Sequence, residues 1–397
     1  MRVIGENMEG HLKTTGCIEQ RILFKRKDGD IYCIGSRESD RYLYASSKEA
    51  LAIYYVLHEI DQGKNIGEIE KLAFERYGLS LDNVKAIVEK GKQAGLIEIE
   101  KHDSIKKNID EFELMLVNLR EFSLKRLYPI FTFLARHMNA LVALMAVVIV
   151  LSLFSLLVDD KWKFFSWKQI FSNKNALIYM WFIQFFSLVL HEFSHAAVGY
   201  KYGARPKSFS IAVFYFCMLI FYIKLPGIYF QERKNRIKIW CAGIIMNLFL
   251  ASCFILLFLN GNDKSQLFFA VGAVSNIMLA LNNLLPFFYS DGYYILATLL
   301  KTPNLRKKSF FQVKKLARSG FSKENLIYWL YLVITASITI TIVGGQILII
   351  TNAIYNSILS GSGFVEILND YFNLFIITGI GIIGKIIKGI RKVYKKE

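Results

Sequence analysis

Two histidines and a glutamate stand close together in the pentad His191-Glu192-Phe193-Ser194-His195. Residues four apart on a helix project from one face about one turn apart, so His191 and His195 could share one metal ion. Neutral imidazole nitrogens bind Zn²⁺, which lowers the pKa of its water from about 15.7 to near 7. Glu192 lies beside the same face and could take the proton of that water. The pentad therefore predicts a hydrolase with one Zn²⁺ per chain, in which the metal-bound water attacks a carbonyl group.

The surroundings of the pentad argue for function more strongly than its spacing, because the same pattern also occurs by chance in soluble helices. The pentad ends an apolar run that begins at Ala176. A charged side chain near the centre of a spanning helix costs about 2.5 kcal/mol or more, and such residues usually mark function. The alternative is a buried, hydrogen-bonded polar patch between helices.

A third metal ligand is expected, because catalytic zinc normally has three protein ligands and an open position for water. The only acidic residue at the end of a downstream apolar run is Asp291, in the segment 283–292 with the sequence NLLPFFYSDG. Asp291 is therefore our candidate. The alternative is that Asp291 merely begins the next loop.

Apolar runs dominate the second half of the chain. A bilayer core needs roughly 20 helical residues. Five runs qualify once the second is extended to residue 200, namely 140–158, 176–190, 239–259, 267–289 and 326–350. A sixth, 371–384, is short and needs flanking lysines to reach the interface. Residues 208–223 are also apolar, but two flanking prolines and their Phe, Tyr and Val content favour strands or a re-entrant hairpin.

These runs predict a polytopic α-helical membrane protein with about six spanning helices over residues 139–397, after a linker and interfacial helix over 111–138. Composition agrees, because 54% apolar and 15% aromatic residues exceed the usual content of a soluble chain. The lipid bilayer is therefore an expected partner. Five cysteines show neither zinc-finger nor disulfide spacing.

Charge predicts the orientation in the membrane. Residues 1–127 hold 21 Lys and Arg against 22 Asp and Glu, whereas residues 128–397 hold 28 against 10. With the N-terminus inside, the inside loops 201–238 and 301–324 carry eight basic residues each. The outside loops 159–175, 260–266 and 356–370 carry four, one and none. We therefore expect a multi-pass protein of the cell membrane with both termini in the cytoplasm and the pentad near the cytoplasmic side.

The same charge pattern excludes one class of partner. The basic excess lies in loops beside apolar runs rather than in a nucleic-acid patch, so nucleic acid is not an expected partner. The first ten residues, MRVIGENMEG, lack the apolar core of a signal peptide, in agreement with a cytoplasmic N-terminus. These features suit a bacterial cytoplasmic membrane.

Residues 1–110 predict a soluble α+β domain of the winged-helix kind. Short strands are expected over 18–26, 30–36 and 41–45, and a last strand over 96–100. Three helices lie between them, with start signals at Ser46 and Glu49, at Asn65 and Glu68, and at Asp82.

The pentad and the later NLLPFFYSDG segment together resemble the site-2 protease family of intramembrane zinc metallopeptidases over roughly residues 130–300. Their pattern is HExxH followed by NxxPxxxxDG. The resemblance implies His191, His195 and Asp291 as zinc ligands and Glu192 as the catalytic base. Family members also carry a segment similar to AGPxxN, and this chain has AGIIMN at 242–247, with isoleucine in place of the proline. Asn247 and Asn283 could donate to a substrate or an oxyanion, or could join helices.

The N-terminal part, residues 18–100, is similar to PqqD-like peptide-recognition domains found beside enzymes that modify ribosomally made peptides. The resemblance implies that a leader peptide adds as a strand to the sheet edge near residues 41–45 and rests on the third helix. The alternative is a plain cytoplasmic cap.

The sequence thus predicts a zinc metalloendopeptidase that cuts a peptide precursor of the modified-peptide or bacteriocin type delivered from the cytoplasm. A peptide-modifying enzyme or an exporter would be a further partner. One alternative is regulated proteolysis of a membrane-bound regulator, in which case the substrate is a membrane protein. Another is a non-catalytic peptide-binding export or immunity protein.

Overall fold

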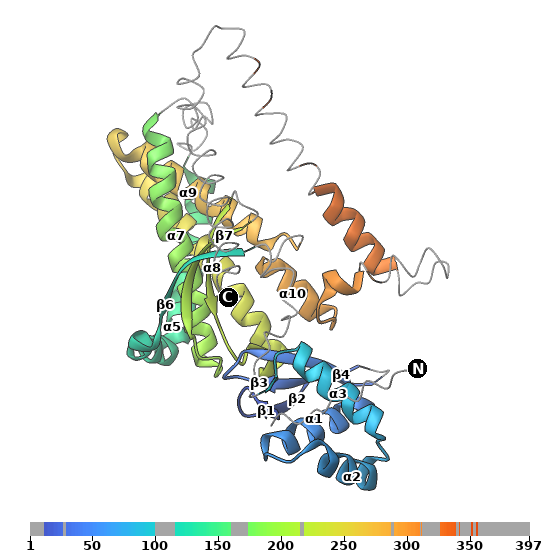
Figure 1. The fold of residues 1–397 in the computed structure, drawn as a ribbon. Coiled ribbons are helices and arrows are strands. Elements are labelled where there is room, and N and C mark those ends of the chain that lie inside the picture. Colours follow the sequence, from blue (N-terminus) through green and yellow to red (C-terminus); the bar gives the residue numbers. More distant parts are fainter. Residues whose placement is uncertain are drawn as a thin grey trace. The chain divides into compact units, whose positions relative to one another are not determined.

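The structure is a computed structural model that describes residues 12–26, 29–99, 116–159, 174–214, 218–286, 290–309 and 326–338, with residues 311, 341, 351 and 355. The chain divides into two units, whose elements are labelled in Figure 1. The N-terminal unit contains Met1–Leu114 with two later segments, Gly203–Arg205 and Leu225–Asn235, and the helical unit contains the rest. The sequence assigned both later segments to the membrane half of the chain.

The N-terminal unit has the predicted order of strands and helices. Its strands are β1 (Leu12–Thr14), β2 (Glu19–Phe24), β3 (Ile31–Ser36), β4 (Arg41–Ser46) and β5 (Ile97–Ile99). Its helices are α1 (Ser47–Asp61), α2 (Ile66–Tyr77) and α3 (Leu81–Gln93), and a short 3-10 turn, η3 (Ile228–Phe230), comes from a later segment. Strands β2, β3 and β4 form an antiparallel sheet in that order, and β1 pairs with β5. The pairing strand β1 was not predicted.

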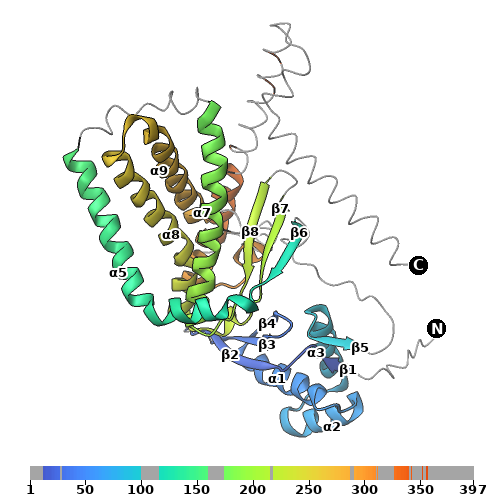
Figure 2. The same ribbon diagram turned by 90° about the vertical axis from the view of Figure 1, so that its left-hand side faces the viewer.

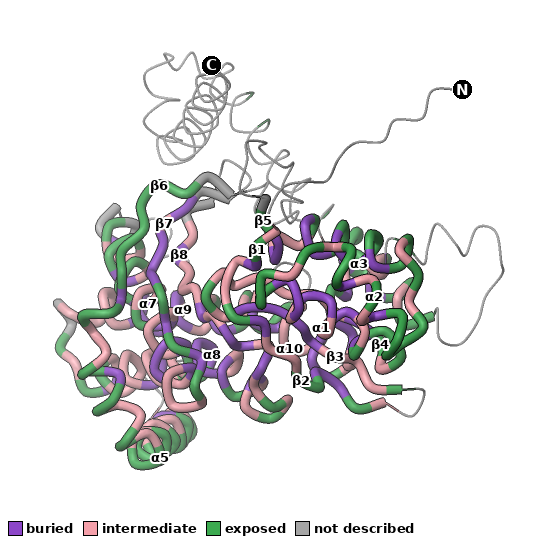
Figure 3. Tube along the Cα trace, turned by 60° about the horizontal axis from the view of Figure 1, so that its bottom comes forward, coloured by how far each residue is buried: buried purple, intermediate pink, exposed green. Residues whose placement is uncertain are grey.

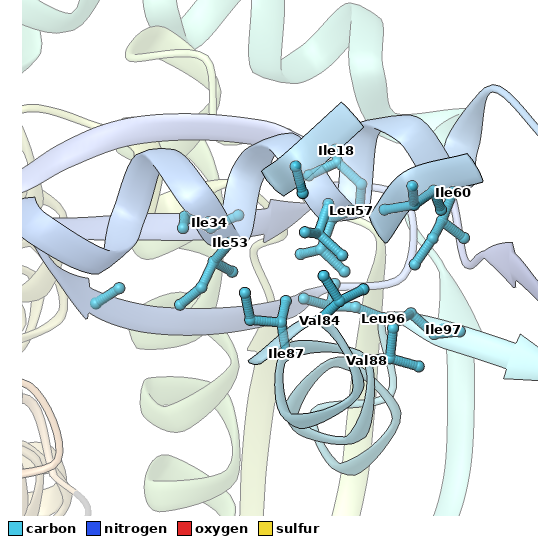
Figure 4. Close-up of a cluster of buried hydrophobic side chains, with 14 of the residues drawn as sticks. Ile18, Ile34, Ile53, Leu57, Ile60, Val84, Ile87, Val88, Leu96 and Ile97 are labelled. Atoms are coloured by element: carbon cyan, nitrogen blue, oxygen red, sulfur yellow. The ribbon is translucent and has the colours of Figure 1, made fainter. Parts of the chain in front are cut away.

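The core of this unit lies between the three-stranded sheet and the helices (Figure 4). Alternate strand residues face opposite sides of a sheet, and Ile34 points to the helices while its neighbour Cys33 belongs to a second cluster. Helix α1 contributes Ile53, Leu57 and Ile60, which recur at helical spacing. The alternation of residues along the strands and the helical spacing along α1 therefore together explain how the sequence forms the core between sheet and helices.

The helix starts agree with the sequence in part. Asn65 and Glu68 form the predicted capping box at α2. Ser46 is the N-cap of α1, but its side chain makes no cap hydrogen bond, so that predicted contact is wrong. Asp82 lies in the first turn of α3, after the N-cap Ser80.

Replacing Asn65 with alanine should loosen the start of α2, because its side chain accepts from the Glu68 amide at 2.9 Å. Loss of such a cap costs about 1 kcal/mol. Hydrogen exchange of the Glu68 amide should therefore be faster in this variant. Ser46→Ala is the control, and an equal acceleration at the start of α1 would contradict the difference between the two caps.

The helical unit contains four long helices that lie alongside one another (Figure 2), together with a sheet. The helices are α5 (Tyr128–Val158), α7 (Lys174–Lys201), α8 (Arg233–Asn260, whose first three residues belong to the other unit) and α9 (Asp263–Leu284), followed by the short α10 (Asp291–Leu299). The strands are β6 (Leu116–Ser123), β7 (Ser208–Phe214) and β8 (Met218–Lys224), and the 3-10 turn η1 (Lys125–Leu127) precedes α5.

Three helices in the described part of the chain are long and apolar enough to cross a membrane. They are residues 125–158, 233–260 and 265–284. In the most apolar window of the first, only 6% of the residues are buried, and the trace of α5 is coloured mostly exposed or intermediate (Figure 3), so this helix presents a largely apolar surface. Such a surface suits lipid better than water.

The other predicted spans are not among these three helices. Helix α7 has 28 residues, about 42 Å at 1.5 Å per residue, but it carries the polar pentad and is not among those three. Residues 326–338 form a shorter apolar helix. The remainder of the run to 350, and the run 371–384, lie outside the described residues apart from residue 341.

The sheet of the helical unit confirms the predicted strands in 208–223 and adds one. Strands β7 and β8 form an antiparallel hairpin, and β6 pairs with the other side of β7. The prediction of a linker over 111–138 is wrong for residues 116–123, which form β6, and its interfacial helix is the start of α5. A short strand with mixed polarity, LVNLREFS, carries no clear alternating pattern.

A charged contact holds β6 in register. Glu121 accepts from the Ser208 hydroxyl on β7 and pairs with Lys224 on β8 at 3.1 Å. The Ser208 hydrogen bond, with a smaller contribution from Lys224, keeps the pKa of Glu121 below its usual value. The carboxylate therefore joins all three strands on one face.

Candidate metal centre

The pentad lies in the second half of α7, where two of its faces have different surroundings. His191 and His195 are buried. Phe193 instead packs with Phe131 of α5 and Phe209 of β7. Because the apolar face is anchored in this way, the rotation of α7 that places both imidazoles together is fixed by ordinary side-chain packing.

Asp291 completes the cluster from a different element. It is the first residue of α10 and is buried. Its Oδ2 lies 3.1 Å from Nε2 of His191, and its Oδ1 lies 3.2 Å from Nε2 of His195. The two Nε2 atoms are 3.2 Å apart. Three side chains from two helices therefore converge on one point.

The spacing of these atoms fits a small metal ion. Bonds of 2.0–2.1 Å to a tetrahedral ion place neighbouring ligand atoms about 3.3 Å apart, close to the 3.1–3.2 Å observed. Glu192 is close as well, because one ligand atom from each of His191, Glu192 and His195 lies within 4.8 Å of the others. Two imidazoles and a carboxylate are a donor set suited to a transition-metal ion.

Outer contacts orient both imidazoles. Nδ1 of His195 lies 2.6 Å from the carbonyl oxygen of Ile239 in α8 and donates to it, because a carbonyl can only accept. In the neutral ring, Nε2 then carries the lone pair that binds a metal. The side-chain amide of Asn247 contacts Nδ1 of His191 at 3.0 Å.

The amide of Asn247 is suited to the same role. Its nitrogen lies nearest His191, and its Oδ1 is buried with no hydrogen-bond partner among the described residues. A half-turn of the amide exchanges the two atoms. Oδ1 then accepts from Nδ1–H, the tautomer in which Nε2 is free to bind an ion. Asn247 of α8 thus contacts His191 of α7, whereas the sequence left open a contact with substrate or a role in joining helices.

The Asn247→Leu variant should bind a divalent metal about 10–100-fold more weakly, the usual effect of losing an outer contact to a ligand histidine. Asn247→Asp should keep the affinity, because a carboxylate also accepts from Nδ1–H. The measurement is competition for Zn²⁺ against a coloured chelator. Asn276→Leu is the control, since Asn276 is equally buried but donates within its own helix. Equal affinity of Asn247→Leu and wild type would refute the role.

Gly243 of α8 forms one wall of the cluster with its backbone alone. A Cβ built at this position would lie 2.6 Å from Nε2 of His195 and still closer to Nε2 of His191. An ion held by both nitrogens would lie about 2.0–2.1 Å from each and would compete with such a Cβ for space. Glycine is therefore required here for space.

A second glycine explains the position of Asp291. A Cβ at Gly292 would collide with the carbonyl of Leu284 at the end of α9. Its absence allows the start of α10 to approach α9 closely. Asp291 thus supplies the carboxylate, and the missing side chain of Gly292 leaves the space for α10 to bring it close to the histidines.

Glu192 is held by the sheet. Its Oε2 accepts from the backbone N–H of Ile223 on β8 at 3.0 Å. In the described part of the sheet, β8 pairs only with β7, so this hydrogen bond is made at a sheet edge. The carboxylate therefore links the pentad to the outer strand β8 of the described sheet.

The structure brings together His191, Glu192, His195 and Asp291. Asn283 donates to the carbonyl of Leu279 in its own helix, and its expected contact with substrate stays a prediction. Sequence reasoning missed the backbone groups of Ile239 and Ile223, for which side-chain patterns give no signal. Gly243 is part of the AGIIMN segment, but no sequence signal indicated that it lies against both histidines.

An aromatic pair also lies beside the cluster without having been predicted. Trp240 of α8 stacks on Tyr294 of α10 at 4.5 Å between ring centroids and lies edge-on to His195 at 6.4 Å. It joins the helix that carries Gly243 to the helix that carries Asp291.

A scan against protein-family models, a search of curated proteins and a search of solved structures each found no match to this chain.

Proposed function

We propose that this chain is a membrane-embedded zinc endopeptidase that cuts a peptide precursor presented from the cytoplasm. The observation that supports this most is the convergence of His191, His195 and Asp291 at 3.1–3.2 Å, with Glu192 beside them. Two imidazoles, one carboxylate and a nearby glutamate are the set that zinc hydrolases use.

The residues of the chain have distinct roles in this proposal. A bound zinc would supply a polarised, acidic water and a Lewis acid for the scissile carbonyl. His191, His195 and Asp291 would hold the ion and leave one position open. Glu192, oriented by the Ile223 amide, would take the proton of the attacking water and pass it to the leaving amine. Ile239 and Asn247 would keep both imidazoles in the binding tautomer.

A substrate must reach the site as an extended strand, because a helix hides its peptide bonds in its own hydrogen bonds. The edge of β8 is suited to receive it, since β8 pairs only with β7 among the described strands and carries the amide that holds Glu192. Strand addition there would bring a peptide bond next to the base.

The N-terminal unit would select the substrate. In the described sheet, β4 is an outer strand that pairs with β3, so residues 41–46 lie at one edge of that sheet. A leader peptide could add as a strand along this edge, as the PqqD-like resemblance implies. The proposed location is a bacterial cytoplasmic membrane, with this unit on the cytoplasmic side.

Metal removal tests the catalytic part. Full-length protein purified in detergent should contain about one zinc per chain and should cleave a precursor peptide encoded nearby. A chelator should abolish cleavage, and added Zn²⁺ should restore it. Metal-free protein, or cleavage that survives chelation, would refute the protease. Bound peptide without cleavage would favour a non-catalytic binding role.

Hydrogen exchange tests the recognition part. Adding the precursor peptide to the full chain should slow exchange of the amides in 41–46. The amides of 19–24, in the opposite outer strand β2, are the internal control. Slower exchange confined to the helical unit would remove the recognition role assigned to β4.

A further inference from the structure

The first turns of α5 have two sides with different surroundings. Phe131 is fully buried and packs with Phe193 and Tyr200 of α7. On the outward side, Ile130 and Phe133 are 54% and 62% exposed and form an apolar strip. Water solvates such large apolar side chains poorly, so their exposure favours an apolar partner on this side of the helix.

Basic side chains lie at both ends of this apolar strip. Lys125 and Arg126 in η1 precede it, and Arg136 follows it by one helical turn. All three are exposed, and none of them forms an ion pair with another residue that the structure describes. The sequence from 122 to 158 contains no aspartate or glutamate. The strip and its cations therefore match an anionic surface that has an apolar layer beneath it.

The length of the helix places this segment outside the apolar core of a bilayer. The apolar helix over 125–158 has 34 residues. It extends about 51 Å at about 1.5 Å per residue, whereas a hydrocarbon core is about 30 Å thick. The charge-free run 140–158 alone fills about 28 Å of that thickness. With the membrane location of the proposed function, residues 125–136 therefore lie at the level of the lipid headgroups.

Contacts with the end of α7 support this level. The hydroxyl groups of Thr132 and Tyr200 lie 3.1 Å apart, and Lys201 donates to Asn139 at 2.8 Å. These contacts hold the first turns of α5 against the end of α7 (Figure 2). Tyrosine and lysine suit a membrane–water interface, because each combines an apolar body with a polar tip. Both helices therefore carry residues typical of the interface at the same level.

We propose that Lys125, Arg126, Ile130, Phe133 and Arg136 form a binding surface for the headgroups of anionic phospholipids. The two guanidinium groups would bind phosphate oxygens through paired hydrogen bonds, and the lysine would add a point charge. The apolar strip would enter the boundary between headgroups and acyl chains. The membrane location is part of the proposed function, whereas the preference for anionic over neutral lipid goes beyond it.

Replacing the cations with glutamine tests this surface. Full-length protein is equilibrated in mixed detergent micelles with equal amounts of phosphatidylglycerol and phosphatidylcholine, and native mass spectrometry measures both bound lipids. Wild type should bind phosphatidylglycerol preferentially. Lys125→Gln, Arg126→Gln and Arg136→Gln should each lower this preference about fivefold, the usual contribution of one cation near an anionic membrane surface. The triple variant should show no preference.

Three lysines of the N-terminal unit provide a charge-matched control. Lys71, Lys85 and Lys90 are exposed on α2 and α3, and replacing all three with glutamine should leave the lipid preference unchanged. Phe133→Ser keeps every cation but should weaken the binding of phosphatidylglycerol, because it removes part of the apolar strip. Inorganic phosphate at the concentration of the lipid should not displace it, since free phosphate has no acyl chains for the strip to contact.

The outcomes are separable from those of the proposed function. Wild type that binds both lipids equally, or a triple variant that keeps the wild-type preference, would overturn the proposal. Loss of the preference in the lysine control would overturn it too, because net charge rather than this surface would then select the lipid. Displacement by inorganic phosphate would indicate a site for a free anion instead. None of these measurements depends on zinc or on cleavage, so they decide the lipid surface even if the protease proposal fails.

Discussion

Replacing Glu192 with glutamine should lower the turnover of the precursor peptide by about 10²–10⁴-fold, the usual contribution of a general base. Glutamine keeps the shape of the side chain and can still accept from the Ile223 amide through its oxygen, so the sheet edge should not move. What is lost is the ability to take a proton. The measurement is single-turnover cleavage by purified protein.

Metal content separates this effect from damage to the site. Glu192→Gln should retain the zinc of wild type, because the proposed ligands are His191, His195 and Asp291. Glu75→Gln on α2 is the matched control, since Glu75 is exposed and lies in the other unit. Equal turnover of Glu192→Gln and wild type would show that Glu192 is not the base. Loss of zinc would show that it is a ligand instead.

Gly243→Ala should abolish metal binding, with a loss of affinity of more than about 100-fold, beyond the range for outer contacts. Alanine in a helix interior is otherwise about 0.5–1 kcal/mol more favourable than glycine. Here its methyl group would occupy the space between both Nε2 atoms. The variant should therefore fold and remain helical but carry no zinc. Metal per chain is measured after gel filtration in detergent.

Leu248→Ala is the control for this prediction, because Leu248 lies on the same helix and is 40% exposed. It should bind zinc like wild type. Full zinc content in Gly243→Ala would mean that the ion does not sit between the two histidines, and the proposed ligand set would have to be abandoned. Asp291 would then have a structural role only.

The part of the site that the sequence could predict is the part encoded by local spacing. His191 and His195 are one helical turn apart, and no folding information is needed to place them on one face. Asp291 is a hundred residues away, and its prediction depended on the orientation of successive apolar runs. The carbonyl of Ile239 and the amide of Ile223 could not be predicted, because every residue carries these groups and only the tertiary fold selects two of them.

The same distinction holds for the fold. The strands and helices of the N-terminal unit follow from periods of two and 3.6 residues, except for the short strand β1, which was not predicted. Strand β6 was missed because it is paired at one edge of a sheet and its composition is mixed. The docking of Tyr229 and Phe230 on β3 and β4 was also missed, because a short aromatic turn after an apolar strand resembles any loop at a membrane surface.

The late position of that aromatic turn has a consequence for biosynthesis. Strands β2, β3 and β4 are made first, but one of their faces is covered only when residues 229 and 230 have been synthesised. By then α5 and α7 have also been synthesised. The N-terminal unit therefore completes its folding only after α5 and α7 of the other unit have been synthesised. Contacts so distant in sequence form slowly, and a nascent chain would expose the aromatic face of the sheet to chaperones until residues 229 and 230 have emerged.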